Sequence, residues 1–128
     1  MAFVDKIKEK ARQNKKSIIL PETMDDRTYY AADGAIKEDI ADIILVGSQA
    51  EITERTAKLG LDLSKASVVD PANCDKFDDY ANLLYETRKA KGMTPEQARE
   101  ILLADTITFG IVMLKAGDAD GLVAGACH

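Results

Sequence analysis

The segment KSIILPETMDDRTYYAA, residues 16–32, places a short apolar run directly before a proline and an acidic turn. Residues 16–20 are rich in isoleucine and stop at Pro21, which is typical of a strand buried in a sheet. The aspartates that follow can cap a helix, and Tyr29, Ala32 and Ile36 have the spacing of its buried face. The segment therefore predicts a strand followed by a helix, the unit from which α/β proteins are built.

The same unit recurs along the chain. Further apolar runs at residues 42–46, 66–70 and 120–126 predict three more strands. After the first of these runs, Ser48 is placed to cap a helix that Gly60 would end. Strands that alternate with helices predict an α/β fold, with a mainly parallel sheet and helices on both faces.

The region before the last strand is helical in pattern. Residues 75–91 place their apolar side chains on one face, and Gly92 provides a stop. Thr94 is placed to cap a further helix that runs to about Ala104, and residues 105–116 follow as a nearly all-round apolar helix before Gly117. Since this segment is apolar almost all round, we expect it to be buried.

The composition is that of an ordinary folded domain. The 128 residues are 46% hydrophobic and 30% charged, which suits one compact unit. Seventeen basic against 22 acidic residues give a net charge of -5, so the chain lacks the basic excess of proteins that bind nucleic acid. An anionic small substrate remains compatible, because helix N-termini and a few arginines can bind phosphate in an acidic protein.

Targeting and metal signals are missing from the sequence. The first 16 residues have the apolar spacing of a helix rather than of a signal peptide, and the longest apolar stretch, residues 107–114, is far shorter than the roughly 20 residues of a membrane span. We therefore expect a cytoplasmic protein with no membrane partner. Cys74 and Cys127 lack metal-type spacing, which predicts free thiols and no metal site.

Ligands of parallel α/β sheets bind beyond the carboxyl ends of the strands. In this chain those ends are followed by residues 21–27, 47–49, 70–73 and 125–128. Arg27 lies in the first turn of its helix, where the helix dipole disfavours a cation. It therefore either pairs with a neighbouring aspartate, Asp25 or Asp26, or binds an anion.

Arg88 continues the apolar face of the 75–91 helix, four residues after Leu84. One interpretation is structural: the stem packs on the protein and the guanidinium neutralises carbonyls at the helix end. The other is functional: the guanidinium points into a cleft and binds phosphate with two donors. Periodicity alone leaves both open.

His128 is the only histidine, and it is a candidate acid, base or hydrogen-bond donor at the end of the last strand. It can equally be a polar residue that leaves a strand. Cys127 has no visible activating partner and is interpreted as a small buried residue. The glycine patterns GxGxxG and GxxxxGK[ST] are absent, which argues against a nucleotide-binding fold of either type.

Four segments occur in an order and spacing similar to the phosphate acetyltransferase and phosphate butyryltransferase family. They are KSIILPETMDDRTYYAA, ADIILVGSQAEI, LLYETRKAKGMTPEQA and GDADGLVAGACH. The resemblance spans essentially all 128 residues. It implies a fold like that of isocitrate and isopropylmalate dehydrogenases, with two α/β domains. Residues 1–128 would then be the amino-terminal portion of the first domain, and the second domain and the carboxyl-terminal segment would be absent.

The resemblance also implies an activity. The family transfers acetyl between acetyl-CoA and phosphate, with coenzyme A as a substrate and no bound cofactor, and a full-length member is expected to be a homodimer. Arg88 matches an arginine that contacts phosphate or acetyl phosphate, and His128 matches the start of an active-site loop. The catalytic base and further arginines belong to later sequence, so the 128-residue chain alone is expected to be inactive.

Three alternatives stay open at this point. A butyryl-specific or other short-chain acyltransferase would share these segments. An oxidoreductase on the same fold would need metal-binding carboxylates and a nicotinamide site, which the sequence does not display. A noncatalytic α/β module or fragment is the third.

Overall fold

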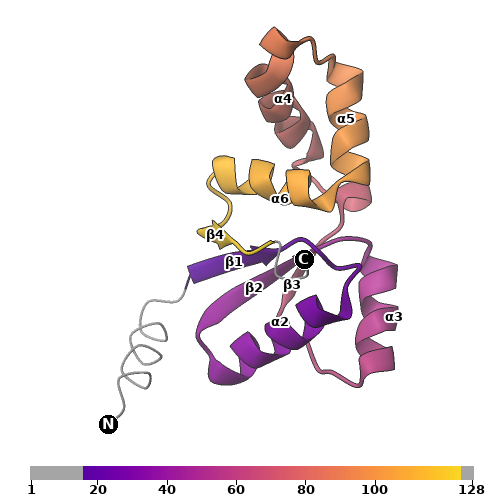
Figure 1. Ribbon diagram of the computed structural model, residues 1–128, viewed down its shortest axis with the longest axis vertical. Coiled ribbons are helices and arrows are strands. Elements are labelled where there is room, and N and C mark those ends of the chain that lie inside the picture. Colours follow the sequence, from indigo (N-terminus) through magenta and orange to yellow (C-terminus); the bar gives the residue numbers. More distant parts are fainter. Residues whose placement is uncertain (1–15, 125–128) are drawn as a thin grey trace.

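The computed structural model describes residues 16–124, and within them a four-stranded sheet has the order β3-β2-β1-β4 with every neighbouring pair parallel (Figure 1). Its strands are β1 (Lys16–Leu20), β2 (Ala41–Val46), β3 (Ser67–Val69) and β4 (Gly121–Leu122). The helices are α2 (Asp26–Glu38), α3 (Gln49–Leu59), α4 (Phe77–Arg88), α5 (Pro95–Ala104) and α6 (Thr106–Lys115). The predicted α/β fold is confirmed.

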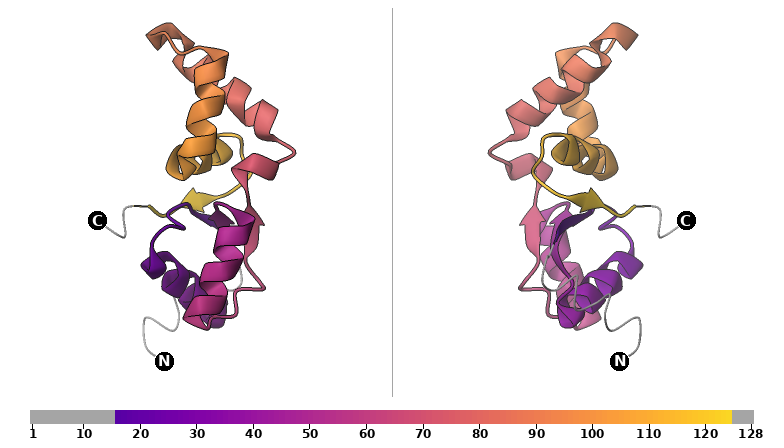
Figure 2. Two further views of the ribbon diagram at one scale, coloured as in Figure 1. Left: turned by 90° about the vertical axis from the view of Figure 1, so that its right-hand side faces the viewer. Right: turned by 90° about the vertical axis from the view of Figure 1, so that its left-hand side faces the viewer.

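Helices cover both faces of the sheet, as the sequence predicts. Successive strand residues point to opposite faces, so Ile19 and Val46 join one apolar cluster while Leu20 and Leu45 join the other. The first cluster includes buried residues of α4, α5 and α6, and the second includes residues of α2 and α3. Figures 1 and 2 show α2 and α3 on one side of the strands and α6 on the other, with α4 and α5 extending beyond α6.

The predicted helix ends are largely correct because they depend on local hydrogen bonds. The Ser48 side chain accepts from the Glu51 amide, and Gly60 closes α3 in the left-handed conformation with φ of 70°. Thr94 and Gln97 form a reciprocal capping box at the start of α5.

Four predicted elements differ from the structure in part. Residues 105–116 form α6, which starts where the Asp105 side chain accepts from the amides of Ile107 and Thr108, after α5 has ended at Ala104 as predicted. That helix is not buried all round, since Ile111 is 41% exposed. The 75–91 helix is α4 followed by a 3-10 turn, and the 66–70 strand is confined to Ser67–Val69. Of the predicted 120–126 strand, the described part forms only Gly121–Leu122.

Two further predictions lie outside the described residues. They are the helix within the first 16 residues and the part of the last strand beyond residue 124.

The loop after β1 is fixed by side chains from three helices. Four consecutive backbone carbonyls, those of residues 21–24, each accept a hydrogen bond from a side chain of α2, α3 or α6. The pairs are Thr106 to Pro21 (2.6 Å), Thr28 to Glu22 (2.8 Å), Tyr29 to Thr23 (2.8 Å) and Arg55 to Met24. Because buried carbonyls without partners are costly, these donors hold the loop against both helical layers.

Gly47, directly after β2, lets this loop pack against the sheet. A Cβ atom built on Gly47 would lie 2.2 Å from Thr23 Oγ1, whose hydroxyl donates to the Val46 carbonyl at 2.9 Å. Thr23 is itself buried. Any side chain at position 47 must therefore displace Thr23 and break its hydrogen bond.

We expect Gly47→Ala to lower the free energy of unfolding by about 1–3 kcal/mol, because overpacking at a buried site forces its neighbours to move. Gly34→Ala is the matched control: Gly34 lies in α2 with open space around its Cβ position, and alanine is favoured over glycine in a helix by up to about 1 kcal/mol. Denaturant unfolding of both variants measures this. Equal effects of the two substitutions would contradict the close approach.

Candidate functional site

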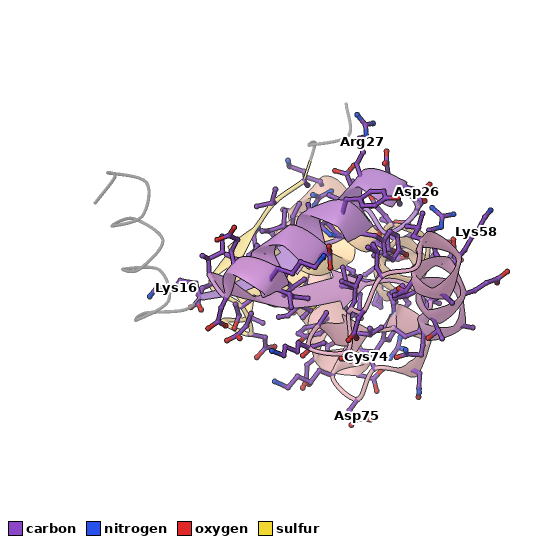
Figure 3. The ribbon with its side chains drawn as sticks, turned by 90° about the horizontal axis from the view of Figure 1, so that it is seen from below. Lys16, Asp26, Arg27, Lys58, Cys74 and Asp75 are labelled. Carbon is purple, nitrogen blue, oxygen red and sulfur yellow. The ribbon has the colours of Figure 1, made fainter. Side chains whose placement is uncertain are left out.

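The N-terminus of α2 is occupied by a side chain of its own loop. Asp25 accepts from the Arg27 amide at 2.9 Å, and its other oxygen lies 3.1 Å from Arg27 Nη2. Figure 3 shows Arg27 at the edge of the molecule, pointing away from its body. Of the two interpretations of Arg27, the pairing with Asp25 is the one present in the structure.

The N-terminus of α3 is occupied in the same way. Asp70, which follows β3, accepts from the Gln49 amide at 3.1 Å and from the Ala72 amide at 2.9 Å. A carboxylate of the chain therefore takes the place that an anionic ligand would take at this helix end. Of the four predicted positions at the carboxyl edge, those after β1 and after β2 thus each have a helix amide bonded to an internal carboxylate.

Arg88 lies elsewhere, in a small pocket between α4 and α6. The pocket has a volume of about 30 Å³. Its lining consists of Leu83, Leu84, Thr87, Arg88, Thr108, Ile111, Val112 and Lys115. Half of these residues are apolar, and the charged ones are two exposed cations with no carboxylate among them, so the charge beside this pocket favours an anion over a cation.

Arg88 differs from the other arginines of residues 16–124 in having no ionic or hydrogen-bonded partner there. Arg27 pairs with Asp25, Arg55 with Asp26 and Glu51, and Arg99 with Asp78. Arg88 is exposed and makes no hydrogen bond to a carbonyl at the end of α4 within the described part of the chain. No hydrogen bond from Arg88 to those carbonyls is present, but its place in the last turn of α4 beside Leu84 agrees with the structural interpretation, so both interpretations of Arg88 stay open.

Both threonine hydroxyls of the pocket already donate hydrogen bonds within the protein. The Thr87 hydroxyl donates to the Leu83 carbonyl at 2.8 Å, and the Thr108 hydroxyl donates to Asp105 Oδ2 at 2.8 Å. A hydroxyl has a single proton to donate. An anion in this pocket would therefore be bound by the charged donors Arg88 and Lys115.

A larger groove suits an anion less well. It lies beside α3, has a volume of about 490 Å³ and is lined mainly by apolar and hydroxyl side chains. Its one charged lining residue is Asp62, which would repel an anion.

A hydrogen-bonded cluster fixes the start of α4 and hence the direction in which the helix extends. Asp118 accepts from the Tyr80 hydroxyl and from Lys76 Nζ at 3.0 Å. The Tyr80 ring packs edge-on against Phe109 of α6, with centroids 5.4 Å apart. The bonds from Tyr80 and Lys76 lower the pKa of Asp118, while burial and the Asp118 carboxylate raise the pKa of Tyr80.

The structure thus separates the predicted site residues. Arg27 follows β1, and Arg88 lies between α4 and α6. His128 and Cys127 lie outside the described residues. Lys115 shares the Arg88 pocket but was not a predicted site residue, because only the packing of α6 on α4 brings the two together.

Residues 16–124 contain neither a metal-type cluster of side chains nor a membrane-spanning helix. No three histidine, cysteine or acidic side chains there form a group that could hold a metal ion. None of the helices in that range has the length and apolar character needed to cross a membrane.

Comparison with known proteins identifies the family. The family model described as phosphate acetyl/butaryl transferase matches residues 2–128. The chain belongs to this family. It is 52% identical over 128 residues to the phosphate acetyltransferase of Thermoanaerobacterium thermosaccharolyticum and 44% identical to that of Acetivibrio thermocellus. All of the chain is covered in both comparisons, but only 38% of each relative.

Solved structures of the family share the fold. The EutD phosphotransacetylase of Staphylococcus aureus has a TM-score of 0.86 and 33% identity, over 98% of this chain and 37% of that protein. A phosphotransacetylase of Streptococcus pyogenes has the same TM-score and 30% identity, over 100% and 39%. The chain therefore spans less than two fifths of the length of these relatives.

We expect Tyr80→Phe to lower the free energy of unfolding by about 1 kcal/mol at neutral pH, since one hydrogen bond to Asp118 is lost. Because the pKa of Asp118 is depressed in the folded state, the stabilisation is present above the ordinary aspartate pKa of about 3.9 and is lost as the pH falls through the lower folded-state value. Thermal unfolding of both proteins as a function of pH measures this.

Tyr85→Phe is the control for this substitution. Tyr85 also belongs to α4, and its hydroxyl has no hydrogen-bond partner in the described residues. A stability difference between wild type and Tyr80→Phe that persists unchanged into strong acid would show that the carboxylate of Asp118 is not responsible.

Proposed function

We propose that this protein transfers an acetyl group between coenzyme A and inorganic phosphate, forming CoA and acetyl phosphate from acetyl-CoA and phosphate. The match of residues 2–128 to the family and the names of the relatives support the reaction. The structural observation that supports it is Arg88, whose guanidinium has no partner among residues 16–124 and which lines a pocket without carboxylates. A planar guanidinium can donate two parallel hydrogen bonds to phosphate.

The described residues account for binding rather than for the whole reaction. In the direction that makes acetyl-CoA, the CoA thiol gives its proton to a carboxylate base and its sulfur attacks the carbonyl of acetyl phosphate. The C–O bond to phosphate then breaks and phosphate leaves, while cations stabilise the developing negative charge; the formation of acetyl phosphate is the same path in reverse. Arg88 would hold phosphate or acetyl phosphate in position. The base and the other cations would come from the part of the relatives that this chain does not span.

Arg27 and His128 are weaker candidates for the same site. For Arg27 to bind phosphate, its ion pair with Asp25 would have to exchange for the ligand. The proposal for His128, as a hydrogen-bond donor or proton carrier, depends on the family resemblance alone.

The proposal also covers cofactor use, cellular location and oligomeric state. Coenzyme A serves as a substrate with no cofactor bound, the protein is cytoplasmic, and its full-length form is a homodimer. The relatives' names support the substrates; the other features follow from the resemblance and from the absence of targeting signals.

A butyryl-specific reaction is the nearest alternative, since the family description names both acyl groups. We expect the protein, as its gene encodes it, to turn over acetyl-CoA with a higher kcat/KM than butyryl-CoA, because the named relatives are phosphate acetyltransferases. Release of CoA in the presence of phosphate measures both substrates. A preference for butyryl-CoA would identify the alternative as correct.

We expect Arg88→Gln to lower kcat/KM for acetyl transfer about tenfold to a hundredfold. This range corresponds to the free energy that hydrogen bonding by one charged group contributes. Most of the loss should be a raised KM for phosphate or acetyl phosphate if the guanidinium binds the ground state as well as the transition state. Steady-state kinetics in both directions measure it. Arg88→Lys, which keeps the charge but not the fork, should recover part of the loss.

Lys91→Gln is the matched control, because Lys91 is exposed, has no ion pair in the described residues and does not line the pocket. Full activity of Arg88→Gln would exclude Arg88 from the site. Equal losses in Arg88→Gln and Lys91→Gln would point to net charge instead of a specific contact.

A further inference from the structure

Lys115 is the last residue of α6, and its position relative to Arg88 is set by helix packing. Thr108, Ile111, Val112 and Lys115 recur at three- and four-residue spacing, so they form one stripe of α6. The stripe lines the same pocket as Leu84, Thr87 and Arg88 of α4. The pocket thus receives one cation from each helix.

The helix dipole explains part of this arrangement. Lys115 and Arg88 each lie in the last turn of their helix, where a cation is favoured. The dipole acts on each helix separately, so it does not account for the fact that both cations line one pocket. An anion bound there would interact with both of them.

No carboxylate in the described part of the chain compensates the two charges. Glu86 is bound to Lys89, with 2.6 Å between Oε2 and Nζ. Asp105 accepts from the Thr108 hydroxyl and from two backbone amides at the start of α6. Neither Lys115 nor Arg88 has an ion pair among residues 16–124, so the pocket has an unbalanced positive charge.

We propose that Lys115 is the second cation of the Arg88 site, and that the two together select the dianionic form of a phosphate group over monoanions. The identification of the anion as phosphate rests on the proposed function. The selectivity follows from the charges, because a dianion interacts with both cations at once and the threonine hydroxyls have no proton left to donate. Free phosphate and the phosphate groups of CoA share this chemistry.

The test is a calorimetric titration of the protein, as its gene encodes it, with inorganic phosphate at about pH 6 and about pH 8. Phosphate changes from mainly monoanionic to mainly dianionic between these values, whereas sulfate is dianionic at both and arginine and lysine stay charged. We expect phosphate affinity to rise about twofold to fivefold with pH, the range that one exposed charge pair contributes, and sulfate affinity to stay constant.

Lys115→Gln should abolish the rise with phosphate and weaken sulfate binding by about twofold to fivefold, while Lys115→Arg should keep both. Lys91→Gln, which removes an exposed lysine away from the pocket, should change neither. Binding to Lys115→Gln that equals wild-type binding at both pH values would overturn the proposal. So would a pH dependence for sulfate that matches the one for phosphate.

The titration also separates this inference from the proposed function. If phosphate binds as described but the protein does not transfer acetyl groups, the proposed function fails and the dianion site stands. If acetyl transfer proceeds and Lys115→Gln binds phosphate normally, the inference fails alone. Repeating the titration with CoA present assigns the source: displacement of phosphate indicates a phosphate group of CoA, and simultaneous binding indicates free phosphate.

Discussion

Four consecutive backbone carbonyls after β1 hold the two helical layers to the central strands. Their donors come from α2 and α3 on one face of the sheet and from α6 on the other. The bonds from Thr106, Thr28 and Tyr29 to the carbonyls of residues 21–23 fix where α6 and α2 begin relative to β1, because an unpaired buried carbonyl costs more than a typical hydrogen bond contributes. The bond from Arg55, in the middle of α3, to Met24 is exposed and adds a weaker tie. The positions of the charged side chains follow from that arrangement.

The same constraint accounts for the separation of the arginines. Thr106 bonds to the loop at the start of α6, and Gly110 then lets α6 lie close to the sheet: a Cβ there would be 2.9 Å from Leu122 and 3.1 Å from Ile19. Tyr80 anchors α4 to the turn that follows α6. Arg88 is thereby placed beside α6, whereas the loop itself keeps Arg27 paired with Asp25 at the sheet edge.

Local signals in the sequence predicted much of the fold. Ser48, Gly60 and Thr94 marked helix ends correctly, because a cap depends on its own few neighbours. The helix over residues 105–116 was predicted with nearly the right bounds, but its exposed side was not, because its side chains are apolar almost all round and only the packing of α6 leaves Ile111 open. Lys115 could not be predicted: it lies 27 residues from Arg88, and only tertiary packing brings them to one pocket.

We propose that the anion of the reaction binds between α4 and α6 rather than at the N-terminus of α2 or α3, where Asp25 and Asp70 each already accept from one helix amide. A crystal structure of the protein, as its gene encodes it, with bound phosphate tests this most directly. The account predicts phosphate oxygens within hydrogen-bonding distance of the Arg88 guanidinium and the Lys115 ammonium. Phosphate bound to Arg27 at the start of α2, with the Arg88 pocket empty, would contradict it.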